Sequence, residues 1–427
     1  MNPERDKKEW YEGITPTVIP RSDHPISRKQ IDEEALKVLY RLRHHGFLAY
    51  LVGGSVRDLL LGKTPKDFDV ATNAHPHEVN ALFRNSRVIG RRFRLVQVFF
   101  KGGKVVEVST FRSRSEFEEV EQEDGTLIRT DSFGSPGEDA FRRDITINGL
   151  FYNIADFSII DYVGGIEDLN RGVIRTIGDA GERFEQDPVR MIRVIRHAAR
   201  TGFTIDAPTY QALLRHREEL KKCSPSRVRD EFLRDLREGV AGPSLNLMLQ
   251  TGLLFSIFPD FPRAYGDRNP SKDRARHLLL SLFGLTDQLI TLRRSVPDSI
   301  LLALLLTPFL QAVSPEHPYL GERERTLYRT EMIRFAIHQT LTPYSFPKGA
   351  KETATQLLMA QGNLAKALRH GVLPKRMRTK RYFHEAVLLY ALEAQARGEA
   401  VPRLLQRAVG PDFLPWWPKD FKRRHPR

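Results

Sequence analysis

Cysteine is nearly absent from this sequence, and long apolar runs are missing. Cys223 is the only cysteine among 427 residues, which excludes a disulfide within the chain and argues against a cysteine-based zinc site. A single thiol suits a reducing compartment, so we expect a cytoplasmic location. The longest apolar run, ILLALLL at 300–306, is far short of the roughly 20 residues that span a membrane, and it predicts a buried helix.

Other signals are lacking as well. The sequence shows no internal repeat and no low-complexity segment. Residues 1–25 are charged, contain proline and have no apolar core, so they do not form a secretory signal. We expect residues 1–26 to be a flexible N-terminal segment.

Positive charge is in excess. The chain has 67 Lys and Arg against 53 Asp and Glu, a formal net charge of +14. An excess of this size points to a polyanionic partner, and RNA fits best. Any single basic cluster is more simply a solvated surface, but their sum favours RNA. The clusters lie at 91–94, 142–144, 272–276, 373–381 and 421–427. They supply the candidate RNA contacts Arg91, Arg92, Lys375, Arg376 and Arg378.

The segment 51–70, LVGGSVRDLLLGKTPKDFDV, carries the clearest motif. We expect a strand over 47–52, a turn at Gly53-Gly54 and a helix over 56–62 that Ser55 caps. Glycines let a phosphate approach the backbone, and a helix N-terminus offers N–H donors. Arg57 lies in the first turn and can reach the same anion. A lone Gly-Gly is only a turn, but this combination predicts a nucleotide site.

Two aspartates close the same segment. Residues 68–72 read as a strand, so Asp67 and Asp69 are expected to point to one face. Carboxylates this close repel each other unless a cation lies between them, and Mg²⁺ prefers oxygen ligands together with substrate phosphates. An Asp-x-Asp pair alone is usually a loop or a strand edge. Beside the glycine turn, it predicts a magnesium site.

Three polar residues further along are candidates for the same site. The segment 104–111 alternates as a strand, with Glu107 on the face of Val105 and Ser109. A glutamate in an apolar strand is costly unless it is paired or liganded, so Glu107 is a candidate third ligand or a support for the site; an exposed-face glutamate is the alternative. Asp144 follows Arg142 and Arg143, where a surface charge cluster is the alternative. Asn148 extends that polar face.

Several motifs in order carry a family resemblance. LVGGSVRDLLLG, KDFDVAT, RRDITINGL, DYVGGIEDLNRGVIRTIG and DPVRMIRVIRHAAR together resemble the class II branch of the polymerase β-like nucleotidyltransferases. That branch holds bacterial poly(A) polymerases and CCA-adding tRNA nucleotidyltransferases. The resemblance implies that Asp67 and Asp69 bind two Mg²⁺ ions with Glu107 close by. It also implies that the glycine turn and Arg57 hold the triphosphate.

The resemblance extends to the ribose and the base. It implies that Arg143 and Asp144 recognise the ribose, that Asp161 with Gly164-Gly165 forms a hinge, and that Asp187 and Arg190 read the base edge. Arginine presents donors and aspartate acceptors, which together can match a Watson–Crick edge. The same helix face continues through Arg193, Arg196 and Arg200. We take Arg193 and Arg196 as weak RNA candidates, with a solvated basic face as the alternative.

The branch of the family is less directly specified. VIGRRFRL at 88–95 resembles the poly(A) polymerase signature, but Gln97 stands where that pattern has histidine. Gln186 stands where the base-reading motif usually has glutamate. Trp416-Trp417 resembles a late double tryptophan of bacterial poly(A) polymerases, although packing of a terminal segment explains it more simply.

A change in pattern along the chain predicts an α+β protein. Strand-like runs fill the first third, and helical periodicity dominates after Asp187. We expect a nucleotidyltransferase head with a mixed sheet at 27–160, a helical neck that recognises the base at 161–240, and a helical body that binds RNA at 241–427. We expect a helix with a Ser cap at 27–46 and a loop over the acidic segment 116–135.

These features predict a template-independent poly(A) polymerase. ATP would be the substrate, the 3′ ends of RNA would be extended, and two Mg²⁺ ions would assist. One alternative is a tRNA nucleotidyltransferase that adds CCA or part of it to tRNA. A more distant alternative is a non-catalytic RNA-binding relative, which would need neither DFD nor RRD.

Overall fold

We describe a computed structural model of the 427-residue chain. The described residues are 15–90, 94–113, 133–266, 269–314, 319, 321–410 and 413–414, together with the backbone of 118–121 and 127–130. They divide into two compact units, which we describe separately. Unit 1 comprises Met1–Arg183 and Gly202–Tyr210, and unit 2 comprises Phe184–Thr201 and Gln211–Arg427. The predicted head, neck and body limits stay a prediction.

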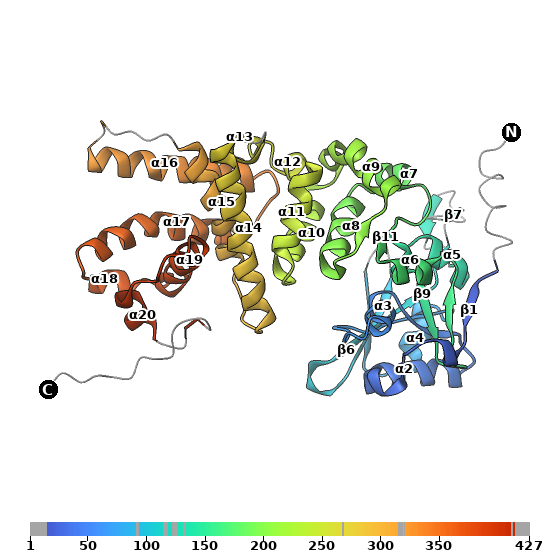
Figure 1. Cartoon of the computed structure of the whole chain (residues 1–427). Coiled ribbons are helices and arrows are strands. Elements are labelled where there is room, and N and C mark those ends of the chain that lie inside the picture. The colour runs from blue at the N-terminus through green and yellow to red at the C-terminus, as the bar shows by residue number, and fades with distance from the viewer. Residues whose placement is uncertain are drawn as a thin grey trace. The chain divides into compact units, whose positions relative to one another are not determined.

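Unit 1 is built on a mixed sheet whose strands β1, β6 and β9 are labelled in Figure 1. The sheet has eight strands in the order β1-β10-β9-β2-β3-β6-β5-β4. Only the β3–β6 pair within this sheet is parallel. The mixed sheet followed by helices confirms the predicted α+β class. The strands are β1 (Thr17–Ile19), β2 (Ala49–Val52), β3 (Asp69–Thr72), β4 (Ser86–Ile89), β5 (Leu95–Phe99), β6 (Val105–Thr110), β9 (Leu150–Asn153) and β10 (Ile159–Asp161).

The two faces of this sheet differ. Alternating apolar side chains such as Leu51, Val70 and Val108 enter a large buried core on one face, to which α2 and α4 also contribute. The opposite face has a small aromatic cluster around Phe151 and, beside it, a row of polar residues. The helices of unit 1 are α2 (Glu33–His44), α3 (Gly54–Leu60), α4 (Pro76–Leu82), α5 (Pro136–Phe141) and α6 (Gly165–Arg171), and the 3₁₀ turn η4 is Thr146–Asn148.

Four local predictions in unit 1 need correction. Ser27 caps only a 3₁₀ turn at Arg28–Gln30, and α2 starts later, after Asp32, whose side chain accepts from Glu34 N. Ser55 does not cap α3; its hydroxyl donates to Val52 O. The strand β3 starts at Asp69, so Asp67 precedes the sheet. The segment expected as a loop at 116–135 contains the paired strands β7 (Glu118–Glu121) and β8 (Leu127–Thr130).

Unit 2 is helical, as the periodicity predicts. Its boundaries with unit 1 fall within α7 (Ala180–Gln186), directly after Thr201, and within α9 (Ala207–His216). Residues 300–306 are buried inside α15, which confirms the predicted buried helix. No helix among the described residues is long and apolar enough to cross a membrane. The longer helices are α8 (Arg190–Thr201), α10 (Pro225–Arg237), α11 (Ala241–Thr251), α14 (Pro270–Thr291), α15 (Asp298–Val313), α16 (Glu322–Leu341), α17 (Lys348–Arg369) and α19 (Phe383–Ala396).

Short elements complete the chain. Unit 1 also holds β11 (Val173–Ile174), which pairs in parallel with β12 (Thr204–Ile205). The remaining helices of unit 2 are α12 (Leu253–Ile257), α13 (Pro262–Tyr265), α18 (Lys375–Arg378) and α20 (Arg403–Val409).

Candidate active site

The register of the sheet aligns the polar residues of the candidate site. Asp69 of β3 pairs with Glu107 of β6, and Glu107 pairs with Gln97 of β5. Residues in register across neighbouring strands point to the same face. All three side chains therefore lie in one row on the face opposite the large core. Gln97 Nε2 donates to Glu107 Oε1 at 3.0 Å, which orients that carboxylate.

The glycine turn leaves the sheet beside this row. Val52, the last residue of β2, is in register with Asp69, so Gly53 follows directly beside the start of β3. Gly53 is buried and has φ of +70°, a conformation that favours glycine. A Cβ at this position would come 3.2 Å from Arg143 Nη1. The turn therefore places the Gly53 backbone against a cationic side chain.

Arg143 lies on the same face as Asp69. Its guanidinium is 5.3 Å from the ring centroid of Phe151, which is in register with Val52. Phe151 and Asp69 flank Val52 on either side, so they lie about 10 Å apart, two strand spacings. Arg143 also pairs with Asp139 at 2.8 Å, and its side chain is 20% exposed. A cation and exposed carboxylates thus border the glycine turn on one face.

Arg57 has a different environment from the one its motif suggests. Only 1% of the residue is exposed. Its Nε and Nη2 donate to Asp58 Oδ1 at 2.9 and 2.8 Å, and Nη1 donates to Asn148 Oδ1 at 2.6 Å. The backbone carbonyl of Asn148 in turn accepts from Arg143 Nη1 at 3.4 Å. Arg57 therefore ties α3 to η4 from beneath the turn, and its direct contact with a phosphate stays a prediction.

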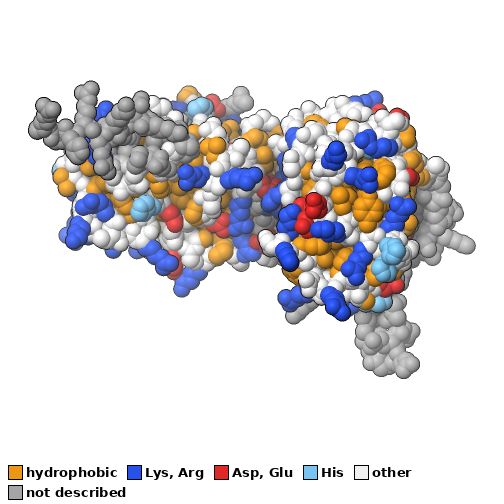
Figure 2. All heavy atoms as spheres, turned by 90° about the horizontal axis from the view of Figure 1, so that it is seen from below, with side chains coloured by type: hydrophobic (Ala, Val, Ile, Leu, Met, Phe, Trp, Pro, Cys, Tyr) orange, Lys and Arg blue, Asp and Glu red, His pale blue; other side chains and the backbone are white. Residues whose placement is uncertain are grey.

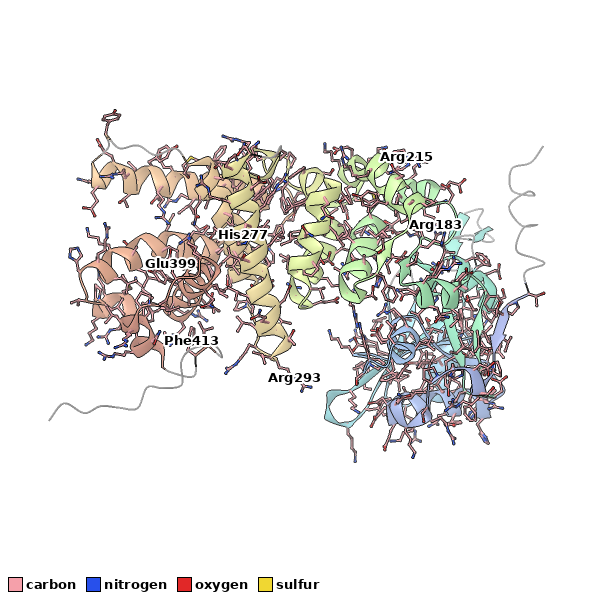
Figure 3. All side chains as sticks on the ribbon, in the orientation of Figure 1. Arg183, Arg215, His277, Arg293, Glu399 and Phe413 are labelled. Carbon is pink, nitrogen blue, oxygen red and sulfur yellow. The ribbon has the colours of Figure 1, made fainter. Side chains whose placement is uncertain are left out.

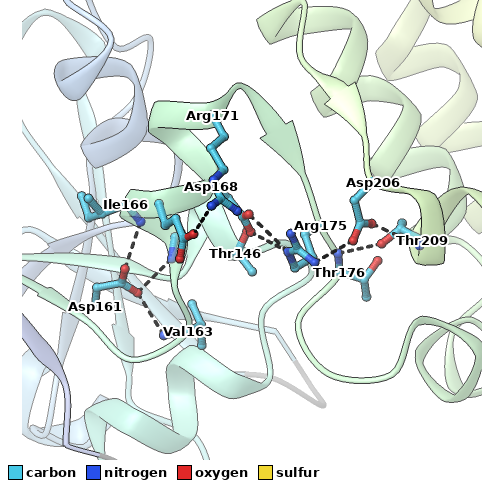
Figure 4. A network of polar contacts seen from close by, with 12 residues as sticks. Thr146, Asp161, Val163, Ile166, Asp168, Arg171, Arg175, Thr176, Asp206 and Thr209 are labelled. Atoms are coloured by element: carbon cyan, nitrogen blue, oxygen red, sulfur yellow. Dashed lines mark hydrogen bonds and ion pairs between the residues drawn. The ribbon is translucent and has the colours of Figure 1, made fainter.

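A second polar network supports η4 from the other side (Figure 4). Asp168 of α6 is buried and accepts from Thr146 Oγ1 at 2.7 Å and from Arg175 Nε at 3.0 Å. Arg175 reaches on to Asp206 at 2.9 Å. A Cβ on Gly165 would come 2.3 Å from Thr146 O, so only glycine allows this approach of α6 to η4. Sequence reasoning missed Asp168 and Arg175, because Thr146 lies 22 residues from Asp168 and Asp206 lies 31 residues from Arg175, which leaves no local signal.

Asp161 precedes α6 and Asp144 precedes η4. The Asp161 carboxylate accepts from the backbone N–H groups of Val163, Gly165 and Ile166 at 2.9, 3.1 and 2.9 Å. It therefore fixes the start of α6, and its hinge role stays a prediction. Asp144 follows Arg143 in the loop before η4, is half-buried, and accepts through its carbonyl from Ile177 N. Arg183, labelled in Figure 3, donates to the carbonyls of Arg142 and Arg143 at 2.7 Å.

The predicted base-reading residues lie in unit 2. Asp187 precedes α8, and both of its carboxylate oxygens accept from Arg227 Nη2 of α10, at 3.0 and 2.9 Å. Arg190 begins α8, and its backbone N–H donates to Asp187 O at 3.1 Å. Gln186 is exposed. Sequence reasoning missed Arg227, because a partner 40 residues away leaves no local signal.

Two arginines of α8 belong to an ion-pair cluster instead of an open basic face. Arg196 is 4% exposed and pairs with Asp235 and with Glu231 of α10. Arg193 pairs with Glu231 at 2.8 Å. Burial raises the pKa of Asp235 to about 7 despite the attraction of Arg196. Burial opposes ionisation of Glu231 also, but the two arginines hold its pKa below the ordinary value. These placements favour a structural role for both arginines.

The other predicted RNA contacts divide into two groups. Lys375, Arg376 and Arg378 form α18 and are exposed. Arg91 and Arg92 lie outside the described residues, as do Trp416 and Trp417. Figure 2 shows lysine and arginine side chains spread over the visible face of each unit, with fewer acidic ones.

The three carboxylates of the candidate site fit Mg²⁺ that is bound together with the substrate phosphates, and not a metal ion that the protein alone holds. Asp67, Asp69 and Glu107 are all exposed. Within the part of the chain that the structure describes, no group of three or more His, Cys, Asp or Glu side chains is gathered to hold a metal. Mg²⁺ is usually held by one or two carboxylates plus phosphate oxygens and water. The hard oxygen donors beside the glycine turn fit that requirement.

Comparisons with known proteins match two regions of the chain to described domains. Residues 49–175 match the poly A polymerase head domain, and residues 202–264 match the probable RNA and SrmB-binding site of polymerase A. Poly(A) polymerase I of Salmonella typhi is 48% identical over 261 residues, 60% of this chain and 56% of that protein. Poly(A) polymerase I of Haemophilus influenzae is 37% identical over 303 residues, 70% of this chain and 66% of that protein. The chain thus spans little more than half the length of the first of these relatives.

CCA-adding enzymes are also similar. That of Leuconostoc mesenteroides is 41% identical over 218 residues, 51% of this chain and 53% of that protein. A crystal structure of a tRNA nucleotidyltransferase complexed with a primer tRNA and an incoming ATP analog superposes with a TM-score of 0.58 at 25% identity, covering 84% of this chain and 95% of the other. The matched head and RNA-binding regions, together with the similarity to both groups of enzymes, show that the chain belongs to the family of poly(A) polymerases and CCA-adding tRNA nucleotidyltransferases.

Proposed function

We propose that this protein is a poly(A) polymerase that transfers AMP from ATP to the 3′ ends of RNA without a template and releases pyrophosphate. The observation that carries the proposal is the row of Asp69, Glu107 and Gln97 beside the Gly53 turn. Phosphoryl transfer needs carboxylates that hold metal ions and a backbone turn that binds phosphate, and here both lie on one face of the sheet. Similarity to poly(A) polymerase I at 48% identity supports the choice of reaction.

Different residues of unit 1 would bind the metal ions, the triphosphate and the ribose. Asp67 and Asp69, with Glu107 beside them, would hold two Mg²⁺ ions, which when bound place positive charge at the attacking and leaving oxygens. The Gly53-Gly54 backbone and Arg143 would bind the triphosphate. The 3′ oxygen of RNA attacks the α-phosphorus, the bond from that phosphorus to the β-bridging oxygen breaks, and the hydroxyl proton passes to solvent. Arg143 with Asp144 would select the ribose, and Asn148 holds Arg143 and Arg57 in place.

The choice of nucleotide belongs to unit 2 in this proposal. Asp187 and Arg190 would read the base edge of ATP. Arg227 would keep the Asp187 carboxylate in position, because it binds both of its oxygens. The exposed arginines and lysine of α18 would contact RNA through its phosphates. A cytoplasmic location, where RNA and ATP are both present, belongs to the same proposal.

The nearer alternative is CCA addition to tRNA. The CCA-adding relatives and the tRNA complex favour it, and Gln97 departs from the poly(A) signature. Incubation of purified protein with ATP alone or CTP alone, on tRNA and on an unstructured RNA, separates the two. Long A tails on both RNAs are expected. Addition that stops after one to three nucleotides on tRNA alone would assign the protein to the alternative, and no incorporation on any RNA would favour a non-catalytic relative.

A further inference from the structure

Unit 2 contains a cavity of about 770 Å³ that the proposed reaction does not use. It is bounded by α15, α16, α17 and α19, and its lining residues lie between Thr307 and Glu399. All of them follow the last residue matched to the family's RNA-binding region, which ends at 264. A cavity of this volume is in the range that small-molecule ligands occupy.

One wall of the cavity is cationic. Arg325 and Arg329 project from α16 and both line it. Among the described residues, neither forms an ion pair with a carboxylate within 4.0 Å. Arg329 approaches α17 at Gly362, where a Cβ would come 3.5 Å from Nη1. This wall can therefore accept an anion, and arginine forks suit phosphate in particular.

Another part of the lining accepts hydrogen bonds. Glu393 of α19 is 13% exposed in its side chain, pairs with Arg397 at 3.2 Å, and accepts from Gln311 Nε2 at 3.4 Å. Gln361 of α17 is 8% exposed, and its Nε2 donates to the carbonyls of Leu357 and Ala386 at 3.0 and 3.2 Å. Both neighbours are acceptors, which fixes the orientation of the amide. Its Oε1 is buried and has no hydrogen-bond partner among the described residues.

The rest of the lining is aromatic and apolar. Tyr328 of α16 and Tyr390 of α19 line the cavity together with Ile333 and Leu358. Glu399, labelled in Figure 3, lines it as well. A simple inorganic anion would leave this apolar surface unused. A ligand that fits has a flat aromatic part, amino or N–H donors on that part, and a negative charge at the other end.

We propose that this cavity binds a nucleotide, with the phosphate at Arg325 and Arg329 and the base on the tyrosine and apolar walls. An amino or N–H group of the base would donate to the Glu393 carboxylate. A second such group would donate to Gln361 Oε1 after a small adjustment of the Gln361 side chain. The nucleotide is either free or part of an RNA chain, since both present the same chemistry. The proposal requires no transfer reaction and goes beyond the proposed function.

The test measures binding on the full chain. Equilibrium dialysis against labelled AMP and, in a separate arm, against a labelled oligoadenylate of about six nucleotides is carried out with wild type, Arg329→Ala and Arg325→Ala. Loss of one charge-assisted contact is expected to weaken binding to the cavity about tenfold or more in each variant. Arg334→Ala is the matched control, because Arg334 is exposed on the same helix and does not line the cavity.

The two arms identify the source of the nucleotide. Binding of AMP that weakens in both cavity variants and not in the control supports a free nucleotide, and the same pattern with the oligonucleotide only supports an RNA subsite. Equal binding of both probes by wild type and by the two cavity variants would overturn the proposal. A rate of single AMP addition at saturating RNA that stays within about twofold in Arg329→Ala is expected. A chain inactive in transfer would refute the proposed function and leave this binding result intact.

Discussion

Motif arginines are buried in both units, but the motif carboxylates of unit 1 and unit 2 differ in their environment. In unit 1 the carboxylates Asp67, Asp69 and Glu107 are exposed, while the motif arginine Arg57 is 1% exposed beneath the glycine turn. In unit 2 the motif aspartate Asp187 is bound by Arg227, and Arg196 is buried between two carboxylates of α10. Membership in a motif therefore does not distinguish a residue that meets a ligand from one that supports its neighbours.

The largest expected effect is the loss of transfer activity when an exposed carboxylate of unit 1 is replaced. Asp69→Asn removes a charge from the row beside the glycine turn and should slow AMP transfer about a thousandfold or more, because the metal-held phosphates lose a ligand. Single-turnover transfer measures the effect. Asp23→Asn, an exposed aspartate elsewhere in unit 1, is the control and should keep the wild-type rate. Wild-type incorporation by Asp69→Asn would remove the proposed site.

The ion-pair cluster of unit 2 should respond in stability. Arg196→Ala leaves Asp235 and Glu231 buried without their shared cation and should cost about 3–5 kcal/mol of local unfolding free energy. Hydrogen exchange of the α8 and α10 amides measures this loss. Arg193→Ala is the matched variant; its side chain is 33% exposed, and about 1 kcal/mol or less is expected. Equal effects from the two variants would mean that burial of the pair does not matter.

The same cluster should depend on pH. The pKa of Asp235 is raised to about 7 by burial, so the folded state binds a proton more tightly than the unfolded state does. That stabilisation is complete below the unfolded pKa of about 3.9 and is lost as pH rises through 7. The unfolding free energy of α8 and α10 should fall by about 1–2 kcal/mol between pH 6 and 8. Asp235→Asn should flatten this dependence; an unchanged slope would place the titration elsewhere.

The smallest expected effect comes from Gln97, which orients Glu107 through one hydrogen bond of 3.0 Å. Gln97→Leu should slow transfer about two- to tenfold, the value of one such bond. Gln97→His keeps a donor and should recover most of the rate. A Leu variant as fast as wild type would show that Glu107 needs no such support.

The strands and the exposed residues of the candidate site could largely be predicted from the sequence. Alternation over 104–111 placed Glu107 on the face of Val105 and Ser109, and the structure gives β6 with that pattern of burial. The glycine turn at Gly53 follows β2 as expected. Both features depend on neighbours in the chain, and local periodicity reports those directly.

The supporting residues could not be predicted in the same way. Arg57 meets Asn148, which is 91 residues away, and Asp187 meets Arg227, which is 40 residues away. Nothing local separates a buried arginine from one that reaches a phosphate, because the same side chain suits both. The start of α2 differs from the predicted start. Ser27 satisfies a capping pattern, but the turn it caps ends at Gln30, and Asp32 caps the helix.

The central claim is that the exposed carboxylates of unit 1 are needed for transfer, whereas the buried Arg57 stabilises the fold around the glycine turn. One paired measurement tests it: the transfer rate and the unfolding free energy of unit 1 for Asp69→Asn and for Arg57→Lys. Lysine cannot reproduce the fork to Asp58 and Asn148, so Arg57→Lys should lose about 2–3 kcal/mol and keep its rate within about tenfold while folded. Asp69→Asn should keep its stability and lose its rate. An Arg57→Lys protein with wild-type stability and no transfer would contradict the account.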